Sequence, residues 1–168
     1  MQNENQFVRL TVATELGEFV ACYSAMGLAG LSFPSKQKNR AALPDSALAP
    51  EVRRWHRTTT VAIKQTLAGR AVNKLPPLDF SGGTEFQRAV WAAMQRIRSG
   101  QTRSYGEIAR DIGKPKAVRA VGGACGANPI PVLVPCHRVL AANKKIGGFS
   151  GGLNWKKTLL AREGVGVG

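Results

Sequence analysis

Asn128-Pro129-Ile130-Pro131-Val132-Leu133-Val134-Pro135-Cys136-His137-Arg138-Val139 is the stretch around which the rest of the chain is organised. Its three prolines prevent a helix, and its Ile, Val and Leu residues predict a rigid extended segment that runs to Pro135. A thiol, an imidazole and a guanidinium then follow in succession. Such a setting can lower a cysteine pKa from its usual value of roughly 8.5 toward the thiolate form. Cys136 is therefore the candidate nucleophile.

Two further side chains can support a thiolate at Cys136. Neighbouring residues of an extended chain point to opposite faces, so His137 would reach the thiol either directly or through a bridging water. Glu163 is an isolated acid in a strongly basic C-terminal stretch. It either orients His137 as the third member of a Cys/His/Glu relay or forms a surface salt bridge with Arg162 or Lys156.

Length and charge limit the class of protein. A chain of 168 residues is long enough for one domain, or two small lobes, with a real core. Its 24 Lys and Arg against 10 Asp and Glu give a formal charge of +14, which indicates a polyanionic partner, with nucleic acid as the first candidate. A hydrophobic content of 43% excludes a disordered basic tail. Most of the excess positive charge lies after Gly83. Residues 84–168 contain 14 Lys and Arg and 4 Asp and Glu, whereas residues 1–83 contain 10 and 6.

From the sequence we expect no membrane span, no leader and no metal site. No apolar run approaches the roughly 18 to 20 residues of a membrane span, and residues 1–6 are polar, with an acid where a signal peptide carries cations. We therefore expect a cytoplasmic, monomeric protein with no membrane partner. Three irregularly spaced cysteines and two histidines match neither a disulfide framework nor a zinc site. We expect no metal and no cofactor, and interpret Cys22 and Cys125 as small hydrophobic residues.

The Pro- and Gly-rich residues 75–83 predict a boundary. We place an N-terminal structural α/β lobe at 1–77, a linker at 78–83 and a C-terminal domain at 84–168. Hydrophobic patterns in the first lobe predict an antiparallel sheet and one amphipathic helix, over 7–13, 18–23, 27–33 and 51–67. A polar, turn-rich stretch, 34–50, precedes the helix. His56 is interpreted as a structural residue on the polar face of that helix.

The second half predicts a helix-turn-helix. A capping-box pattern at 84–87 opens a helix that closes at Gly100, and short helices over 104–112 and 116–124 flank a tight turn. The second of these is rich in small residues around one long basic side chain, Arg119, a composition that suits close approach to a narrow minor groove. Alternatively, the small residues pack against another helix. The expected DNA-contacting residues are Lys116, Arg119, Ala120, Gly122, Gly123 and Ala124.

A glycine-rich loop, residues 146–152, joins the Cys136 segment to the last predicted helix, 154–162. Such a loop can approach a ligand closely. It matches neither GxGxxG nor GxxxxGK[ST], so no nucleotide cofactor site is predicted.

Together these motifs resemble one known family. They are Arg119-Ala120-Val121-Gly122-Gly123-Ala124, Asn128-Pro129-x-Pro131, Pro135-Cys136-His137-Arg138-Val139, Ser150-Gly151-Gly152 and Leu159-Leu160-Ala161-Arg162-Glu163-Gly164. They are similar to those of the O6-alkylguanine-DNA alkyltransferases, or methylated-DNA–protein-cysteine methyltransferases. The resemblance covers roughly residues 84–164, whereas the N-terminal lobe fits by its size and by the order of its strands and helix.

The resemblance implies an α+β fold, with a small ribonuclease-H-like N-terminal lobe and a mostly helical C-terminal lobe that carries the helix-turn-helix. It implies DNA repair in which Cys136 accepts the alkyl group from O6 of guanine in double-stranded DNA, with O4-alkylthymine as a further candidate adduct. Glu163, His137 and a water would maintain the thiolate, and Asn128 would brace the turn that leads to the active-site segment. Because the product thioether has no easy leaving route, each chain would react once.

The resemblance also implies roles in holding the damaged base, which must leave the duplex to be reached. Arg119 would fill the space of the extruded base, and Tyr105 would assist its rotation and donate to guanine N3. The backbone of Cys136, Val139 and Ser150 would hold the flipped base. Phe149 stands where many relatives carry Tyr, so an apolar wall replaces one polar contact. Some relatives have a zinc site in the N-terminal lobe, but Cys22 and His56 do not suffice as its ligands.

Two other functions are compatible with these residues. In the first, the protein recognises and flips alkylated bases without repairing them, and Cys136 is inert. In the second, the chain is a cysteine hydrolase that uses Cys136, His137 and Glu163, and its charge is incidental.

Overall fold

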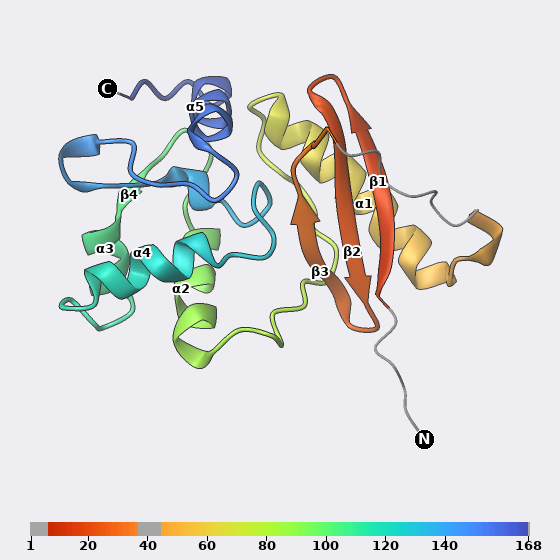
Figure 1. Cartoon of the computed structure of the whole chain (residues 1–168), viewed down its shortest axis with the longest axis horizontal. Helices are drawn as coiled ribbons and strands as arrows, with labels where there is room; N and C mark the ends of the chain where they lie inside the picture. The colour runs from red at the N-terminus through yellow and green to blue at the C-terminus, as the bar shows by residue number, and fades with distance from the viewer. Residues whose placement is uncertain (1–6, 37–44, 168) are drawn as a thin grey trace.

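The computed structural model describes residues 7–36 and 45–167 and has the expected α+β architecture (Figure 1). A three-stranded antiparallel sheet, in the order β1-β2-β3, is built from β1 Val8–Thr14, β2 Gly17–Ser24 and β3 Gly27–Ser32. The predicted strands are therefore confirmed, with their ends shifted by one residue at most. Within the predicted turn-rich stretch, residues 37–44 lie outside the described part of the chain.

One long helix, α1 Pro50–Leu67, covers the sheet and confirms the predicted amphipathic helix. His56 corrects one expectation, because it does not lie on the polar face. Its Nδ1 lies 2.9 Å from the Tyr23 hydroxyl and its Nε2 lies 3.1 Å from the Thr11 carbonyl oxygen. His56 thus fastens α1 to β1 and β2. The apolar core between helix and sheet contains Leu10, Val12, Phe19, Ala21, Tyr23, Val52, Ala62, Ile63 and Leu67.

Four helices and a pair of short parallel strands form the described C-terminal half. They are α2 Glu85–Gln95, β4 Arg103–Ser104, α3 Tyr105–Asp111, α4 Val118–Gly126, β5 Val139–Leu140 and α5 Leu153–Arg162. The predicted capping box opens α2, since the Thr84 hydroxyl accepts from the Gln87 N–H (3.1 Å) and the Gln87 Oε1 accepts from the Thr84 N–H (2.9 Å). A second box, formed by Ser104 and Glu107, opens α3.

Helices α3 and α4 form the predicted helix-turn-helix, but α4 begins two residues later than expected. A separate turn precedes it, closed by a 2.9 Å bond from the Ala117 N–H to the Lys114 carbonyl. Lys116 therefore lies in this turn, and Arg119 lies in the first turn of α4. On the other side, α4 packs against α2, where the Trp91 Nε1–H donates to the Ala124 carbonyl at 2.8 Å.

The stretch before Cys136 is not the extended segment that its prolines predicted. It folds into consecutive turns, with a 2.9 Å bond from the Val134 N–H to the Ile130 carbonyl and a positive φ of 75° at Val132. The cause is Asn128, whose Nδ2 donates to the Val134 carbonyl (2.8 Å) while its Oδ1 accepts from the Ile130 N–H (3.0 Å). The expected bracing role of Asn128 thus has a specific geometry. A 3-10 turn, Cys136–Arg138, follows directly.

The N-terminal lobe is fastened to the rest of the chain at several places. The Leu31 N–H of β3 donates to the Pro129 carbonyl at 2.9 Å, which ties the sheet to the turns before Cys136. The start of the predicted linker also runs alongside β3. The Leu28 carbonyl accepts from the Asp79 N–H (2.7 Å), and the Leu28 N–H donates to the Pro77 carbonyl (2.8 Å). Near the end of α1, Gly69 packs against the last turn of α5.

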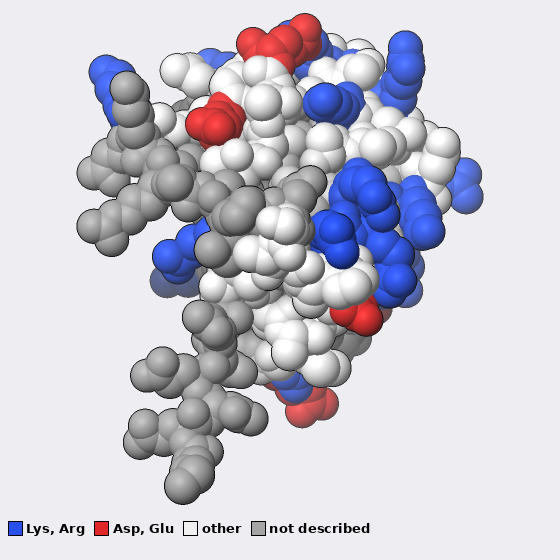
Figure 2. Space-filling model, turned by 90° about the vertical axis from the view of Figure 1, so that its right-hand side faces the viewer, with Lys and Arg blue, Asp and Glu red and all other residues white. Residues whose placement is uncertain are grey.

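Positive charge extends over both halves of the molecule. Helix α1 exposes Arg53, Arg54, Arg57 and Lys64. In the view of Figure 2, Lys and Arg side chains gather on the right-hand side of the molecule. Across residues 7–36 and 45–167, no helix is both long and apolar enough to cross a membrane.

We predict that Gly69→Ala destabilises the protein far more than Gly113→Ala. Both glycines have positive φ, +71° and +75°, so alanine is strained at each by about 1–2 kcal/mol. At Gly69 the new Cβ would also meet the Arg162 carbonyl oxygen at 2.0 Å, whereas at Gly113 nothing lies within 4 Å. Urea unfolding should show an additional loss of about 1–3 kcal/mol for Gly69→Ala. Equal losses would contradict this packing.

Candidate active site

Cys136 faces a cavity of about 600 Å³ between the helix-turn-helix and the 146–152 loop. Its side chain is nearly buried, at 4% exposure. The other lining residues come from α3, from α4 and from the loop: Tyr105, Val118, Arg119, Gly122, Cys125, Gly126, Gly148, Phe149 and Ser150.

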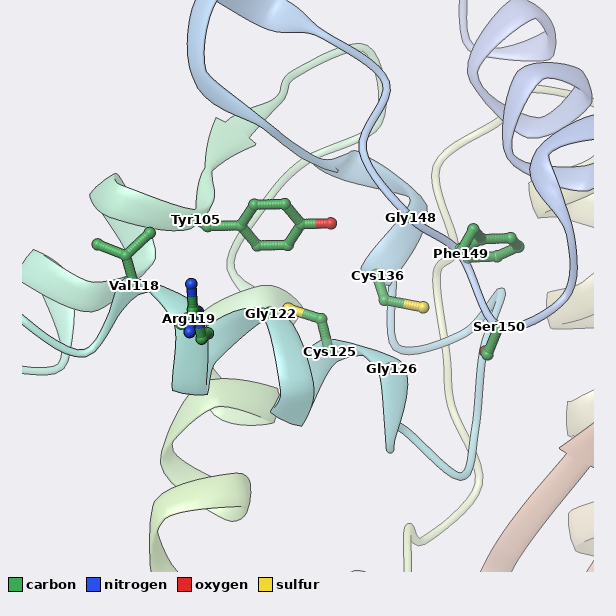
Figure 3. Close-up of a pocket in the computed structure, with 10 residues that line it drawn as sticks. All are labelled: Tyr105, Val118, Arg119, Gly122, Cys125, Gly126, Cys136, Gly148, Phe149 and Ser150. Carbon is green, nitrogen blue, oxygen red and sulfur yellow. The ribbon is translucent and has the colours of Figure 1, made fainter.

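Figure 3 shows the cavity as a slot. The Tyr105 ring lies along one side, with its hydroxyl directed toward Cys136 and Gly148, and α4 lies along the other. Val118 and Arg119 stand at one end, while Phe149 and Ser150 stand at the end near Cys136. A cavity lined by an aromatic ring and by small residues of α4 can take a planar heteroaromatic ring.

Behind Cys136, a buried carboxylate joins two neighbouring side chains. Glu163 Oε1 lies 3.0 Å from His137 Nε2. The carboxylate also accepts from Arg138, from Nε at 3.0 Å and from Nη2 at 2.7 Å. Arg138 Nη1 donates to the Ile97 carbonyl at 2.6 Å. Of the two interpretations of Glu163, contact with His137 is therefore the one observed, since Arg162 instead pairs with Glu15 at 2.8 Å.

The charge states of this pair follow from burial and hydrogen bonding. Burial lowers the pKa of His137, although Glu163 opposes the shift, so the imidazole is neutral at pH 7. Burial alone would raise the pKa of Glu163, but the bonds from His137 and Arg138 outweigh it and lower that pKa to about 2. A neutral His137 that donates from Nε2 keeps Nδ1 as an acceptor. Nδ1 is buried and has no hydrogen-bond partner within the described residues.

The thiol departs from the sequence-based expectation. Burial raises the pKa of Cys136, and neither hydrogen bonding by Asn128 nor the positive charge of Lys156 cancels the shift. The expected lowering of the cysteine pKa is therefore wrong for the free protein, because apolar surroundings disfavour the thiolate more than the neighbouring donors favour it. The thiol holds its proton at rest, and a base must take that proton during the reaction.

Lys156 is a functional residue that the sequence analysis missed. Its fully buried Nζ donates to the Val139 carbonyl at 2.7 Å and to the Gly148 carbonyl at 3.0 Å, and it lies 6.0 Å from the centroid of the Tyr105 ring. Burial lowers its pKa to about 8. The signal was present, since a lysine at this position shares one helical face with Leu159 and Leu160.

Cys125 is a buried core residue, as expected from its interpretation as a small hydrophobic residue. Its side chain also lines the cavity beside Cys136, which was not expected. Val118, Gly122 and Cys125 follow each other at helical spacing, a pattern that could have identified the face of α4 turned to the cavity. Burial raises the pKa of Cys125 to about 12, which makes it a neutral thiol. Its Sγ lies 3.5 Å from Met94 Sδ.

The remaining predicted site residues separate into three groups. Tyr105, Arg119, Gly122, Phe149 and Ser150 line the cavity with Cys136, and Lys116, Ala120 and Gly123 are at least partly exposed beside it. Asn128, His137 and Glu163 support Cys136 from behind.

One of the predicted contact residues, Ala124, needs correction. Ala124 is only 3% exposed, because it packs against α2, so the helix-packing alternative holds for this residue and its side chain cannot reach DNA. The Val139 side chain is buried, and its carbonyl accepts from Lys156 Nζ at 2.7 Å; the contact of its backbone with a flipped base stays a prediction.

A buried thiol in a slot beside a helix-turn-helix, with a histidine and a carboxylate behind it, defines a class of helix-turn-helix proteins whose chemistry centres on cysteine. A family model described as 6-O-methylguanine DNA methyltransferase, DNA binding domain, matches residues 85–165. The chain is 41% identical over 152 residues to the methylated-DNA–protein-cysteine methyltransferase of Methanosarcina acetivorans, an alignment that covers 89% of this chain and 93% of that protein. It therefore belongs to the methylated-DNA–protein-cysteine methyltransferase family.

Two further similarities extend over most of the chain. The inducible methylated-DNA–protein-cysteine methyltransferase of Bacillus subtilis is 42% identical over 150 residues, covering 84% of this chain and 83% of that one. The crystal structure of Mycobacterium tuberculosis OGT in complex with DNA aligns with a TM-score of 0.74 and 37% identity, over 91% of this chain and 90% of that chain. The likeness therefore includes the N-terminal lobe.

We predict that Glu163→Gln destabilises the folded protein by about 3 kcal/mol at pH 7, because it leaves Arg138 without its buried counter-charge. Since folding lowers the pKa of Glu163 from 4.5 to about 2, its contribution is complete above pH 4.5 and is lost as the pH falls toward 2. Urea unfolding of both proteins at several pH values should show their difference shrinking over that window. The control is Glu15→Gln, which removes an exposed pair worth about 1 kcal/mol or less. Similar losses from both variants would contradict the prediction.

Proposed function

We propose that this protein repairs double-stranded DNA by transferring one alkyl group from O6 of a flipped guanine to Sγ of Cys136, and that the transfer inactivates it. The observation that carries the proposal is the place of the Cys136 thiol, in a cavity lined by Tyr105 and α4, with a buried His137–Glu163 pair behind it. Membership of the methyltransferase family supports the same chemistry. A cysteine hydrolase would leave the formal charge of +14 and the helix-turn-helix without a function.

The proposed reaction begins with loss of the thiol proton. His137 Nδ1 accepts the proton, directly or through a water, and Glu163 stabilises the resulting imidazolium through Nε2. The thiolate then attacks the alkyl carbon in line with its bond to O6. A carbon–sulfur bond forms, the carbon–oxygen bond breaks, and its electron pair goes to the base. Tyr105 donates a hydrogen bond to guanine N3, which stabilises the negative charge that develops on the base. The guanine anion then takes a proton from solvent, and the His137 imidazolium returns the thiol proton to solvent, so the protons balance.

The product is a thioether, which is not a leaving group for a second thiol at neutral pH. Cys125 is near enough to line the same cavity, but its raised pKa keeps it protonated and a poor nucleophile. We therefore expect one transfer per chain and no regeneration.

The helix-turn-helix would present the DNA to the slot. Ala120 and Gly123 are exposed small residues on α4, and they allow the helix to approach a minor groove closely. Arg119 lies at the far end of the cavity from Phe149, where it would occupy the gap left by the flipped base. Lys116 would contact phosphate from the turn before α4. The division at 78–83 into two lobes, the monomeric state and the cytoplasmic location remain part of this proposal.

The deciding experiment is intact mass spectrometry of the protein after incubation with a duplex that contains O6-methylguanine. We expect the wild type to gain a single methyl group and Cys136→Ala to gain none. The matched control is Cys125→Ala, which removes the neighbouring thiol of the same cavity and should still gain one methyl group. Peptide mapping should assign the methyl group to residue 136.

The same experiment tests the alternative, a sensor of alkylated bases. An unchanged wild-type mass together with preferential binding of the damaged duplex would favour the sensor. A mass increase that persists in Cys136→Ala would assign the acceptor to another residue and would refute the role of Cys136.

We further predict that Arg119→Ala and Lys116→Ala affect different steps. Without the Arg119 side chain, nothing fills the gap that the flipped base leaves in the duplex. Base flipping then costs a few kcal/mol more, so the rate of transfer should fall by about tenfold or more. Lys116→Ala should instead weaken binding of all duplexes equally and reduce the slope of log affinity against log salt by about one. Rapid-quench transfer assays and fluorescence anisotropy at several salt concentrations separate these effects. A uniform loss of affinity in Arg119→Ala, with an unchanged transfer rate, would contradict its assignment.

A further inference from the structure

We propose that the N-terminal lobe supplies a positioning residue to the active site. Phe33, which follows β3, holds the 146–152 loop in place, and through Phe149 it fixes the wall of the cavity beside Cys136. The lobe that the sequence marked as structural would thereby help to determine which alkylated bases react. This inference rests on the proposed function, whose residues it extends.

The first observation is a cluster of aromatic rings that joins the lobe to the cavity wall. The Phe33 ring lies 5.7 Å from that of Phe149, at an interplanar angle of 72°, which is an edge-to-face contact. It also lies 4.9 Å from Trp155 of α5 and 5.6 Å from Phe19 of β2. Phe33 is thus the ring through which Phe149 is connected to the fully buried Phe19.

The second observation concerns the backbone of the loop. A Cβ added at Gly151 would lie 2.4 Å from Phe33 Cε2 and 3.0 Å from Phe149 Cε1. The loop therefore presses directly against Phe33, at a position where a side chain larger than hydrogen does not fit. Ser150, which lines the cavity, lies between the two loop residues in contact with this ring.

The third observation is that the loop has its other anchor on the opposite side. Lys156 donates to the Gly148 carbonyl at 3.0 Å, so the loop is held by a hydrogen bond before Phe149 and by an aromatic ring after it. A loop with four glycines among residues 146–152 has little conformational preference of its own. These two anchors, together with the 3.0 Å bond from the Gly152 N–H to the Phe149 carbonyl, therefore hold the cavity wall in position.

The end of β3 also contacts the turns that lead to Cys136. The Leu31 N–H donates to the Pro129 carbonyl at 2.9 Å. Residues 31 and 33 thus reach the chain before the nucleophile and the wall beside it. A displacement of this strand end would change the distance between Cys136 and Phe149, and hence the fit of the alkylated base.

The test compares alkyl transfer to wild type and to Phe33→Ala from two duplexes of one sequence, carrying O6-methylguanine or O6-benzylguanine. Loss of the Phe33–Phe149 contact should slow methyl transfer by about three- to tenfold, the worth of one aromatic pair. Benzyl transfer should be slowed less, because a wider cavity accommodates the larger group. The methyl-to-benzyl rate ratio is the readout, and Phe33→Leu, which keeps most of the apolar volume, should restore it. The affinity for undamaged duplex should stay within about twofold, since the helix-turn-helix is untouched.

A compensating pair gives a sharper test. Gly151→Ala places a methyl group against the Phe33 ring and should slow methyl transfer, whereas in the Phe33→Ala background the same methyl group meets only Phe149 Cε1, at 3.0 Å, and should cost less. The control for general weakening of the lobe is Trp55→Ala, which removes a ring that stacks on Tyr23 inside the lobe. It should lower the unfolding temperature without changing the rate ratio.

Each outcome decides for or against the proposal. An unchanged ratio in Phe33→Ala, the same change in ratio in Trp55→Ala, or an equal cost of Gly151→Ala in both backgrounds would overturn it. All rates are measured at least about 10 °C below the unfolding temperature of the weakest variant, so that each protein stays folded. If the wild type takes up no alkyl group from either duplex, the proposed function fails, and that result is distinct from an unchanged ratio in a reactive protein.

Discussion

The interaction on which the structure depends is the buried carboxylate of Glu163 between the guanidinium of Arg138 and the imidazole of His137. A carboxylate at 1% exposure is tolerable only with partners that satisfy its charge and its lone pairs. His137 and Arg138 are the two residues that follow Cys136 in the chain. Their bonds to Glu163 therefore hold the end of α5 against the Cys136–Arg138 turn. The same end of α5 reaches the N-terminal lobe, because Arg162 donates to the Leu67 carbonyl and its own carbonyl packs on Gly69. One buried charge thus fixes the thiol, the last helix and α1 relative to one another.

The two buried cations near the thiol have different electrostatic roles. The charge of Arg138 is balanced by Glu163, whereas Lys156 has two carbonyl partners and, within the described residues, no carboxylate. Burial without a counter-ion lowers the pKa of Lys156, and burial also raises the pKa of Cys136. Each of these groups favours the charged form of the other. Ionisation of the thiol therefore supplies the missing counter-charge, which is a reason to keep an ammonium in an otherwise apolar site.

Local sequence patterns predicted most of the fold but only part of the candidate site. Alternation and helical spacing located the three strands, α1 and α5, and the Thr84–Gln87 box located the start of α2, because each depends on neighbouring residues. The turns at 129–135 could not be foreseen from their prolines, since the Asn128 side chain folds them by bonding to residues on both sides. The role of Arg138 and the place of Phe33 depend on contacts between segments far apart in the sequence. Lys156 and Cys125 were predictable in principle, because helical spacing assigns both to inward faces.

A protein that reacts once has different needs from an enzyme that turns over. In the proposed reaction the alkyl group stays on Cys136, so the wall beside the thiol never has to open to release it, and only the repaired base must return to the duplex. A wall held from both sides, by Lys156 on Gly148 and by Phe33 on Phe149, is compatible with such a reaction. In a catalyst the same anchorage would slow product release. Here it restricts the orientations open to the alkylated base, and in-line attack by sulfur on carbon depends on that restriction.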